Sequence, residues 1–443
     1  TYTDKNNPTN NYNNYDVRGG MDLKYGINES FTLDMALIPD FGQVRSDDQV
    51  LNLSPFEVRF DENRPFFMEG TELFSKANLF YSRRIGGQPI NYWSAYDEVN
   101  DEAGEALVGN PSSAKLLNAT KISGRTKGNV GLGFFNAVTG NTYATIENEA
   151  GEQRKVLTNP LSNYNIVVVD KALKNRSYIS LINTNVMRQG SAYDANVTGT
   201  DFNLATKNNR FALSGTAALS QIIDSGENDM GYSYALKVGK GSGNFQYNVW
   251  HGIESDRYNR NDLGFLYNNN TITQGITLRY NIYEDFGAFN SLFSDFSLSH
   301  EMLYEPRAFS TMNFNGSGGL VMKSFFAFGA FLGGQLLEGR NYFEPRTEDL
   351  SQFSATAPYF YGGLWISSDY RQQFALDINV MYGQDRALFN ERVYEVSVSP
   401  RIRPNDRTMI IARINYTTNL GQNGYVNNLD DGTIFYGNRN IQS

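Results

Sequence analysis

The stretch DFGQVRSDDQVLNLSPFEVRFDENRPFFMEGTELFSKANLFYSRRIGG, residues 40–87, decides how the rest of the chain is interpreted. It is dense in charged and aromatic side chains together, whereas the segments on both sides alternate polar and apolar residues with a period of two. A segment with so many charges cannot face lipid. We therefore expect it to be an ordered segment folded inside a β-barrel.

The flanking alternation predicts strands whose two faces meet different environments. In the first predicted strand, residues 17–27, Met21 and Leu23 share one face, and Asp22 and Lys24 share the other. Later segments repeat the pattern over about 9–11 residues, the length of a tilted strand that crosses a bilayer. The charged residues expected on the polar, lumen-facing side of the wall are Arg18, Asp22, Lys24, Asp34, Lys237, Arg279 and Asp377.

The predicted connections alternate between short turns, such as residues 127–128, and longer polar loops, such as residues 221–231 and 418–431. Short periplasmic turns and long external loops are typical of outer-membrane barrels. The alternation holds only if LFYSRRIG, residues 79–86, is left out of the wall. Residues 39–111, hereafter the insert, then form a single insertion into the lumen between the second and third wall strands.

The sequence thus predicts an all-β fold, a large antiparallel transmembrane β-barrel that occupies residues 1–443. We expect roughly 18 or more wall strands in this chain and further strands beyond both of its ends. The parity of the connections places residues 1–15 in an external loop, so that at least one earlier strand is expected upstream. A closed barrel is expected because an open sheet edge in lipid leaves backbone groups unpaired.

The amino-acid composition limits which cellular compartment and which kinds of partner are expected for the chain. The net charge of −9 argues against a nucleic-acid partner. The 28 Tyr and 30 Phe residues fit interfacial aromatic girdles, and the absence of Cys suits a Gram-negative cell envelope. The longest uncharged apolar run, residues 325–337, is shorter than the roughly 18 residues of a transmembrane helix. Outer-membrane lipid is therefore the expected surrounding.

Within the insert, Ser54 at the N-cap, Pro55 and Glu57 form the pattern of a capping box. This pattern predicts a short helix on which Phe56 and Phe60 stack. The polar insert residues expected to pair in the lumen are Ser54, Glu57, Arg59, Asp61, Glu62, Arg64, Glu69, Arg83 and Arg84. Two interpretations stay open: the insert fills and rigidifies the pore, or it is a gate or binding platform that moves.

Three segments carry a resemblance: VRGGMDLKYGI, LDMALIPDFGQVRSDDQVLNLSPFEVRFDENRPFFMEG and LFYSRRIGG. Together they resemble the barrel of an uncharacterised outer-membrane family common in Bacteroidota, in which a carbohydrate-binding module of the family-nine type typically precedes a barrel of unknown function. The resemblance is specific over residues 17–87 and looser to the end. It implies an outer-membrane location, a missing upstream module and further strands. It transfers no catalytic residue.

Other candidate sites are weaker. His300 is one of two histidines, and Ser297 is the better-placed serine for a hydrolase pair, although such pairs are common by chance. The acidic residues 97–105 are oxygen-rich but match no calcium-binding spacing. We therefore expect no catalytic residue, no metal site and no cofactor.

The expected function is non-enzymatic, namely transport or handling of a solute, glycan or polypeptide by a plugged, porin-like barrel of the cell outer membrane. One alternative is a non-conducting envelope scaffold that docks partner proteins. Another is a membrane-embedded hydrolase. The possible partners are thus outer-membrane lipid, a glycan or other envelope proteins.

Overall fold

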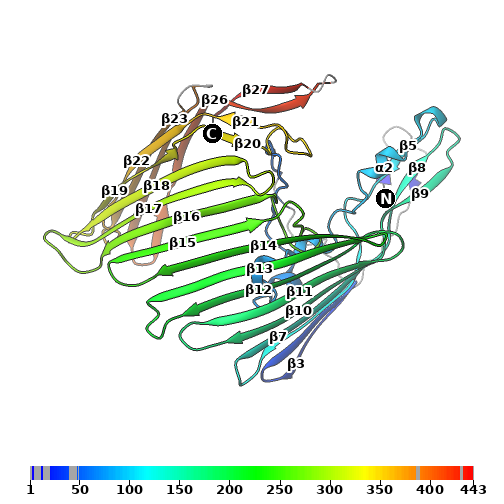
Figure 1. Ribbon diagram of the computed structural model, residues 1–443, viewed down its shortest axis with the longest axis horizontal. Helices are drawn as coiled ribbons and strands as arrows, with labels where there is room; N and C mark the ends of the chain where they lie inside the picture. Colours follow the sequence, from blue (N-terminus) through cyan, green and yellow to red (C-terminus); the bar gives the residue numbers. More distant parts are fainter. Residues whose placement is uncertain are drawn as a thin grey trace.

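One antiparallel sheet dominates the molecule (Figure 1). This computed structural model describes residues 2–3, 11–12, 20–38, 47, 49–385, 390–429 and 433–442. Within these residues the sheet has 20 strands. In chain order they are β3 (Met21–Asn28), β4 (Phe31–Leu37), β6 (Leu116–Arg125), β7 (Val130–Thr139), β10 (Ser162–Ala172), β11 (Tyr178–Arg188), β12 (Asp194–Ala205), β13 (Phe211–Asp224), β14 (Glu227–Lys240), β15 (Phe245–Glu254), β16 (Thr271–Ile282), β17 (Phe289–Leu303), β18 (Phe309–Met322), β19 (Ala327–Gln335), β22 (Tyr359–Ser367), β23 (Phe374–Asp385), β24 (Arg392–Asn405), β25 (Thr408–Ile411), β26 (Ile414–Asn428) and β27 (Ile434–Gln442). The large antiparallel sheet predicted from the period of two is confirmed.

The strands follow one another as antiparallel neighbours, with one irregularity at β24. β25 pairs with the end of β24, where Arg401 faces Ile411, and β26 pairs with the rest, where Val398 faces Ile414. Pro400 lies between these two pairings and has no N–H to donate into a ladder. β25 and β26 therefore act as one interrupted strand.

The two faces of the sheet differ sharply in chemistry. Leu132, Val169 and Leu181 face one another on neighbouring strands and are all exposed. On the opposite face, Phe135, Ile166 and Thr184 are buried at the next level. We call the face that contacts residues 64–85 the insert face, and the other face the outer face.

Two of the predicted long loops are wrong. β13 and β14 extend through most of residues 221–231 and leave only Ser225-Gly226 as a tight turn. β26 likewise continues to Asn428 through the segment predicted as a loop. The polar composition of these segments is typical of loops, but a backbone ladder does not need apolar side chains to continue.

The insert lies between β4 and β6, which pair directly with each other. It contains short elements only: α1 (Pro65–Met68), η1 (Lys76–Asn78), η2 (Ser82–Arg84), α2 (Ser94–Asp97), η3 (Asp101–Ala103) and β5 (Ala106–Gly109). LFYSRRIG contains η2 and no strand of the sheet. β5 pairs with β8 (Thr142–Glu147), which pairs with β9 (Gln153–Asn159), and this small sheet lies beyond one end of the large one (Figure 1).

Two further hairpins complete the described structure. β20 (Gly339–Asn341) pairs with β21 (Ser354–Thr356) within the connection from β19 to β22. β1 (Tyr2–Thr3) pairs with β2 (Asn11–Tyr12). No helix of the described residues is long and apolar enough to cross a membrane.

The predicted helix at the Ser54 capping box is absent. Instead, Asn52 Oδ1 accepts hydrogen bonds from the backbone N–H and the hydroxyl of Ser54, which makes an Asx turn. Phe56 packs against Tyr267 and Phe343 rather than against Phe60. Competition from the Asn52 side chain thus replaces the cap, a local signal that the S-P-F-E pattern alone did not reveal.

An apolar core lies where the insert meets the sheet. Phe67, Phe74, Leu79 and Ile85 of the insert are buried in one cluster with residues of the wall. Their wall partners lie on the insert face of five strands and in the β15–β16 loop: Leu116, Ala119, Phe135, Ala137, Tyr164, Ile166, Val168, Ile182, Val186, Ala195, Val197 and Leu263. The insert is therefore anchored over β6 to β12 by hydrophobic burial.

Candidate functional site

The interface between the insert and the insert face forms the candidate site, and its centre is the buried Arg64. The guanidinium donates to both carboxylate oxygens of Glu62 at 2.8–2.9 Å and to the carbonyl oxygens of Ser82 and Ile85 at 2.7 and 2.8 Å. It also lies 4.1 Å from the centroid of the Phe67 ring. Arg64 therefore ties α1 to both ends of η2.

Glu62 completes this centre. Its carboxylate accepts a hydrogen bond from the Ser82 hydroxyl at 2.6 Å as well as those from Arg64. Burial alone acts to raise the pKa of Glu62, but the hydrogen bonds and charge of Arg64 outweigh burial and lower the pKa below its ordinary value. Glu62 thus stays ionised at neutral pH, and the centre carries a full ion pair.

Arg84 links the insert to the β15–β16 loop. Its guanidinium forms a bidentate pair with Glu57, at 2.7 and 2.9 Å, and donates to the carbonyl oxygen of Gly264 at 3.1 Å. Arg59 lies over the rings of Tyr81 and Phe265, 5.6 and 5.8 Å from their centroids. The loop after β15 is therefore held against the insert by planar guanidinium contacts.

Arg83 contacts the insert itself. It pairs with Asp47 at 2.6 Å and donates to the backbone carbonyl of Asp61. The Asp61 position thus contributes its main chain rather than its carboxylate to the described contacts of Arg83. The insert carboxylates Glu57 and Glu62 and their arginines are brought together as expected.

A charge ladder joins the insert to the first three wall strands. Lys24, Asp34 and Lys121 face one another across β3, β4 and β6 on the insert face. Lys24 pairs with Glu69 of the insert at 2.8 Å, and Lys121 lies 3.8 Å from Asp34. Lys121 also donates to the carbonyl oxygens of Phe66 and Glu69. Sequence reasoning missed Lys121, although its place among alternating residues in TKISGR was a usable signal.

A second cluster, around η1, was also missed. Lys76 pairs with the buried Asp170 at 3.4 Å and lies 4.5 Å from the centroid of the Tyr178 ring. Arg125 pairs with the same Asp170 at 2.5 Å, and Asp201 accepts a hydrogen bond from the backbone N–H of Ala77. Both acids occupy insert-face positions of their strands, which the period of two could have identified.

The remaining predicted wall residues lie apart from the insert. Lys237 and Arg279 line a cavity of about 160 Å³ on the insert face. Among the described residues, no hydrogen bond or ion pair joins either side chain to the insert. Asp377 accepts hydrogen bonds from Ser367 and Tyr370, and Arg18 lies outside the described residues.

The prediction that Ser297 is well placed beside His300 is wrong. Residues three apart in a strand point to opposite faces, so Ser297 lies on the insert face and His300 on the outer face. The His300 ring stacks on Phe309, and its Nδ1 lies 3.1 Å from Gln274 Nε2. No cluster of three or more metal-ligating side chains occurs among the described residues.

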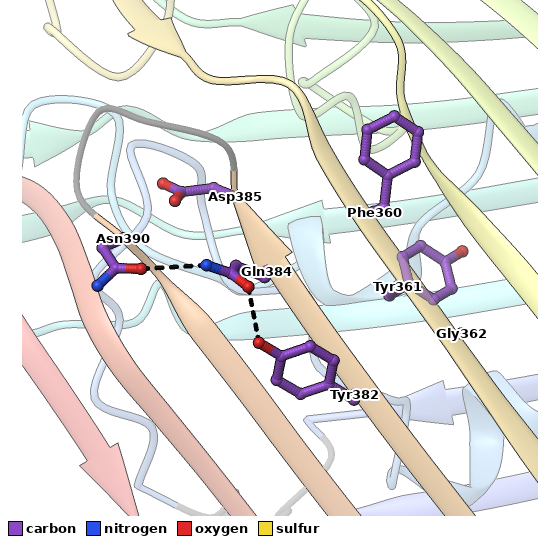
Figure 2. A pocket seen from close by; sticks show the side chains of 7 residues that line it. All are labelled: Phe360, Tyr361, Gly362, Tyr382, Gln384, Asp385 and Asn390. Carbon is purple, nitrogen blue, oxygen red and sulfur yellow. Dashed lines mark hydrogen bonds between the residues drawn. The ribbon is translucent and has the colours of Figure 1, made fainter.

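Two cavities open where β22 and β23 approach their ends. Figure 2 shows the larger, about 650 Å³, with a chain of hydrogen bonds from Tyr382 to Gln384 to Asn390 along its lining. The other, about 450 Å³, lies beside β21 and is lined in part by Tyr359 and Tyr361. Asp385 lines both cavities and Glu391 lines the second, so carboxylates accompany the carboxamides, hydroxyls and aromatic rings there.

The chain belongs to an uncharacterised family: the family model described as "Domain of unknown function (DUF5916)" matches residues 1–443. No curated protein and no solved structure matches it.

Proposed function

We propose that this member of an uncharacterised family is a β-barrel of a cell outer membrane, partly plugged by its insert, that passes or handles a polar solute. The observation that carries the proposal is the chemistry of the outer face. Exposed apolar side chains follow it from β3 to β26; Met21, Leu181, Leu213, Leu236, Leu332, Leu364 and Tyr416 are examples. Soluble proteins rarely expose a contiguous apolar surface of this extent.

Closure of the sheet is part of the proposal. The proposal places the last strand, β27, beside the first, β3, and the strand order of the sheet supports this placement. A sheet surrounded by lipid needs this closure, because unpaired backbone groups in hydrocarbon cost several kcal/mol each. The outer face then contacts lipid and the insert face lines the interior.

The insert acts as a partial plug in this proposal. Its apolar core and its ion pairs hold it over β6 to β12, as described above. On the insert face, cavities lie along β13 to β16 and β22 to β24, away from that core, and one of about 380 Å³ begins at Tyr178 and Asp201, at the edge of the insert near η1. This asymmetry supports a path that passes beside the insert, with the insert limiting its width.

Single-channel conductance in planar bilayers tests the plug. Deleting residues 49–78 and joining the ends with a Gly/Ser linker is expected to raise the conductance several-fold. Arg84→Ala, which removes the Glu57 pair and the Gly264 contact, is expected to increase the frequency of openings without deleting any backbone.

The matched control shortens the turn between β8 and β9, residues 148–152, which lies outside the large sheet. Its conductance should equal that of the parent chain. Folding of every variant is checked by far-UV circular dichroism and by heat-dependent gel mobility. Equal conductance of folded parent and folded deletion variant contradicts the plug.

A second candidate function, an envelope scaffold, is favoured by one exposed cluster. On α2 and just before it, Trp93 stacks on Tyr96 with ring centroids 5.8 Å apart, and Trp93 is 69% exposed. The cluster lies beside the small sheet of β5, β8 and β9 (Figure 1). Aromatic side chains of this kind are enriched in protein interfaces. A stoichiometric complex that dissociates on Trp93→Ser, together with absence of conductance, would favour the scaffold.

A further inference from the structure

An aromatic track follows the insert face of the wall opposite the anchored insert. Tyr359, Tyr361 and Trp365 point to this face from β22. Phe331 of β19 lies at the level between Tyr361 and Trp365, because it faces Gly363. Phe293 of β17 reaches the level of Trp365, since both rings lie over Gly319. The five residues form a continuous series from the β21 end of β22 toward the turn that follows it.

Glycines beneath the rings let them lie along the wall. A Cβ at Gly363 would come within 2.4 Å of Phe331 Cζ, and one at Gly319 would come within 2.5 Å of both Phe293 and Trp365. The same holds for Gly333 under Tyr361 and Gly329 under Trp365. Each ring thus crosses a neighbouring strand at a glycine, which has no side chain to block it.

The rings pair in nearly parallel orientations. Phe293 and Trp365 are stacked with an interplanar angle of 15° and centroids 5.9 Å apart. Tyr359 and Tyr361 are stacked at 18° and 6.5 Å. Phe293 and Tyr359 remain 40% and 38% exposed, so the track is not a buried core.

Polar side chains flank the track on the same face. Asn315 accepts the hydroxyl hydrogen bond of Tyr361, and Asn379 faces Trp365 across the β22–β23 ladder. The track borders the cavity of about 450 Å³ at its Tyr359 end. It borders another of about 230 Å³, lined by Trp365, Asn379 and Ser397, at its other end.

We propose that this track binds a neutral oligosaccharide. Pyranose rings present C–H faces that stack on aromatic rings, while their edges carry hydroxyls that pair with carboxamides and hydroxyls of the kind found here. Carboxylates of Asp295, Asp377 and Glu395 occupy the same face and disfavour an anionic glycan. The inference rests on the proposed function in one respect, that the insert face lines a water-filled interior.

Tryptophan fluorescence of the detergent-solubilised chain tests the proposal. The chain has three Trp residues, so Trp93→Phe with Trp250→Phe leaves Trp365 as the single reporter. The probes are maltohexaose, cellohexaose, mannohexaose and xylohexaose. At least one is expected to shift or quench the Trp365 emission saturably, and hexagalacturonate is expected to bind at least tenfold more weakly.

Isothermal titration calorimetry with the sugar that responds then compares the affinities of the variants. Trp365→Ala and Tyr361→Ala are expected to weaken binding at least tenfold, whereas Trp93→Ala, outside the track, leaves it unchanged. Gly319→Val, whose Cβ would meet the Phe293 and Trp365 rings first, gives a second disruption that retains every aromatic residue. Absence of binding by all four sugars at millimolar concentration overturns the proposal, as does unchanged affinity in folded Trp365→Ala and Tyr361→Ala.

The same sugar added to a planar bilayer separates this inference from the proposed function. Sugar binding without ion conductance overturns the proposed pore but leaves the proposed sugar-binding track standing. Conductance with no sugar binding leaves the pore and overturns the track. If the sugar interrupts the conductance of the parent chain but not that of Trp365→Ala, both the pore and the sugar-binding track are supported.

Discussion

At the scale of single residues, the insert depends on one buried cation. Arg64 makes four hydrogen-bonded contacts through a rigid fork that Lys cannot reproduce. Removing its side chain takes the bidentate ion pair from the largely buried Glu62, which keeps only the Ser82 hydroxyl, the backbone N–H groups of residues 63 and 64 and a longer contact with Arg83, at 3.9 Å, among the described contacts. Loss of one partner of a buried pair typically costs about 3–5 kcal/mol.

Arg64→Ala is therefore expected to lower the free energy of unfolding of the insert by about 3–5 kcal/mol, and Arg64→Lys by nearly as much. Limited proteolysis under native conditions, as a function of denaturant, measures the opening of the insert. The control is Arg257→Ala, which removes an exposed pair with Asp229 whose contribution is about 0–1 kcal/mol. Equal effects of Arg64→Ala and Arg257→Ala would show that Arg64 is not the anchor.

The small sheet carries the clearest pH dependence. The hydrogen bond from Arg154, then the backbone bond from Asn100, lower the pKa of Glu105 to about 2, from an ordinary value of 4.5. A lowered folded pKa contributes stability that is complete above about 4.5 and is lost as the pH falls toward 2. Amide exchange of β5 and β9 should accelerate over this window, and Glu105→Gln should abolish that pH dependence. A retained pH profile in Glu105→Gln would contradict the assignment.

At the scale of elements, the alternation of residues predicted the sheet and both of its faces, because a period of two follows directly from strand geometry. It also separated LFYSRRIG from the wall. It did not predict where hairpins turn at residues 221–231, since backbone pairing continues through polar side chains there. The Ser54 cap failed because Asn52 offers a competing local hydrogen bond. Lys121, Asp170 and Asp201 were missed since their partners, distant in sequence, lie in the insert.

The docking of LFYSRRIG is testable at this scale. Leu79 is fully buried against wall residues, so Leu79→Ala should destabilise the docked insert by about 2–5 kcal/mol. Native-state proteolysis should cut the insert faster while the far-UV circular dichroism of the sheet stays unchanged. Leu51→Ala, at a position 84% exposed, is the matched control and should change nothing. A global loss of strand signal in Leu79→Ala would mean that the insert and the sheet fold as one unit.

At the scale of the whole molecule, the interruption at Pro400 affects strand parity. With β25 and β26 acting as one strand, β3 and β27 run in the same direction, so a direct pairing of these two strands is parallel. Bacterial single-chain barrels usually have an even number of antiparallel strands. Whether the number of strands is odd or even can be predicted from the sequence only where the predicted turns are placed correctly.

The central claim is that the outer face meets lipid while the insert face meets the interior. The chain lacks Cys, so single cysteines can be placed without background and labelled with a nitroxide. Scanning residues 211–219 of β13 and 359–367 of β22 in lipid vesicles, with oxygen and a water-soluble nickel complex as relaxing agents, measures both environments at every position. The account predicts a period of two in which outer-face sites such as Leu213 and Leu364 are accessible to oxygen and shielded from nickel, and their neighbours are not. Uniform access of nickel to both faces would contradict it.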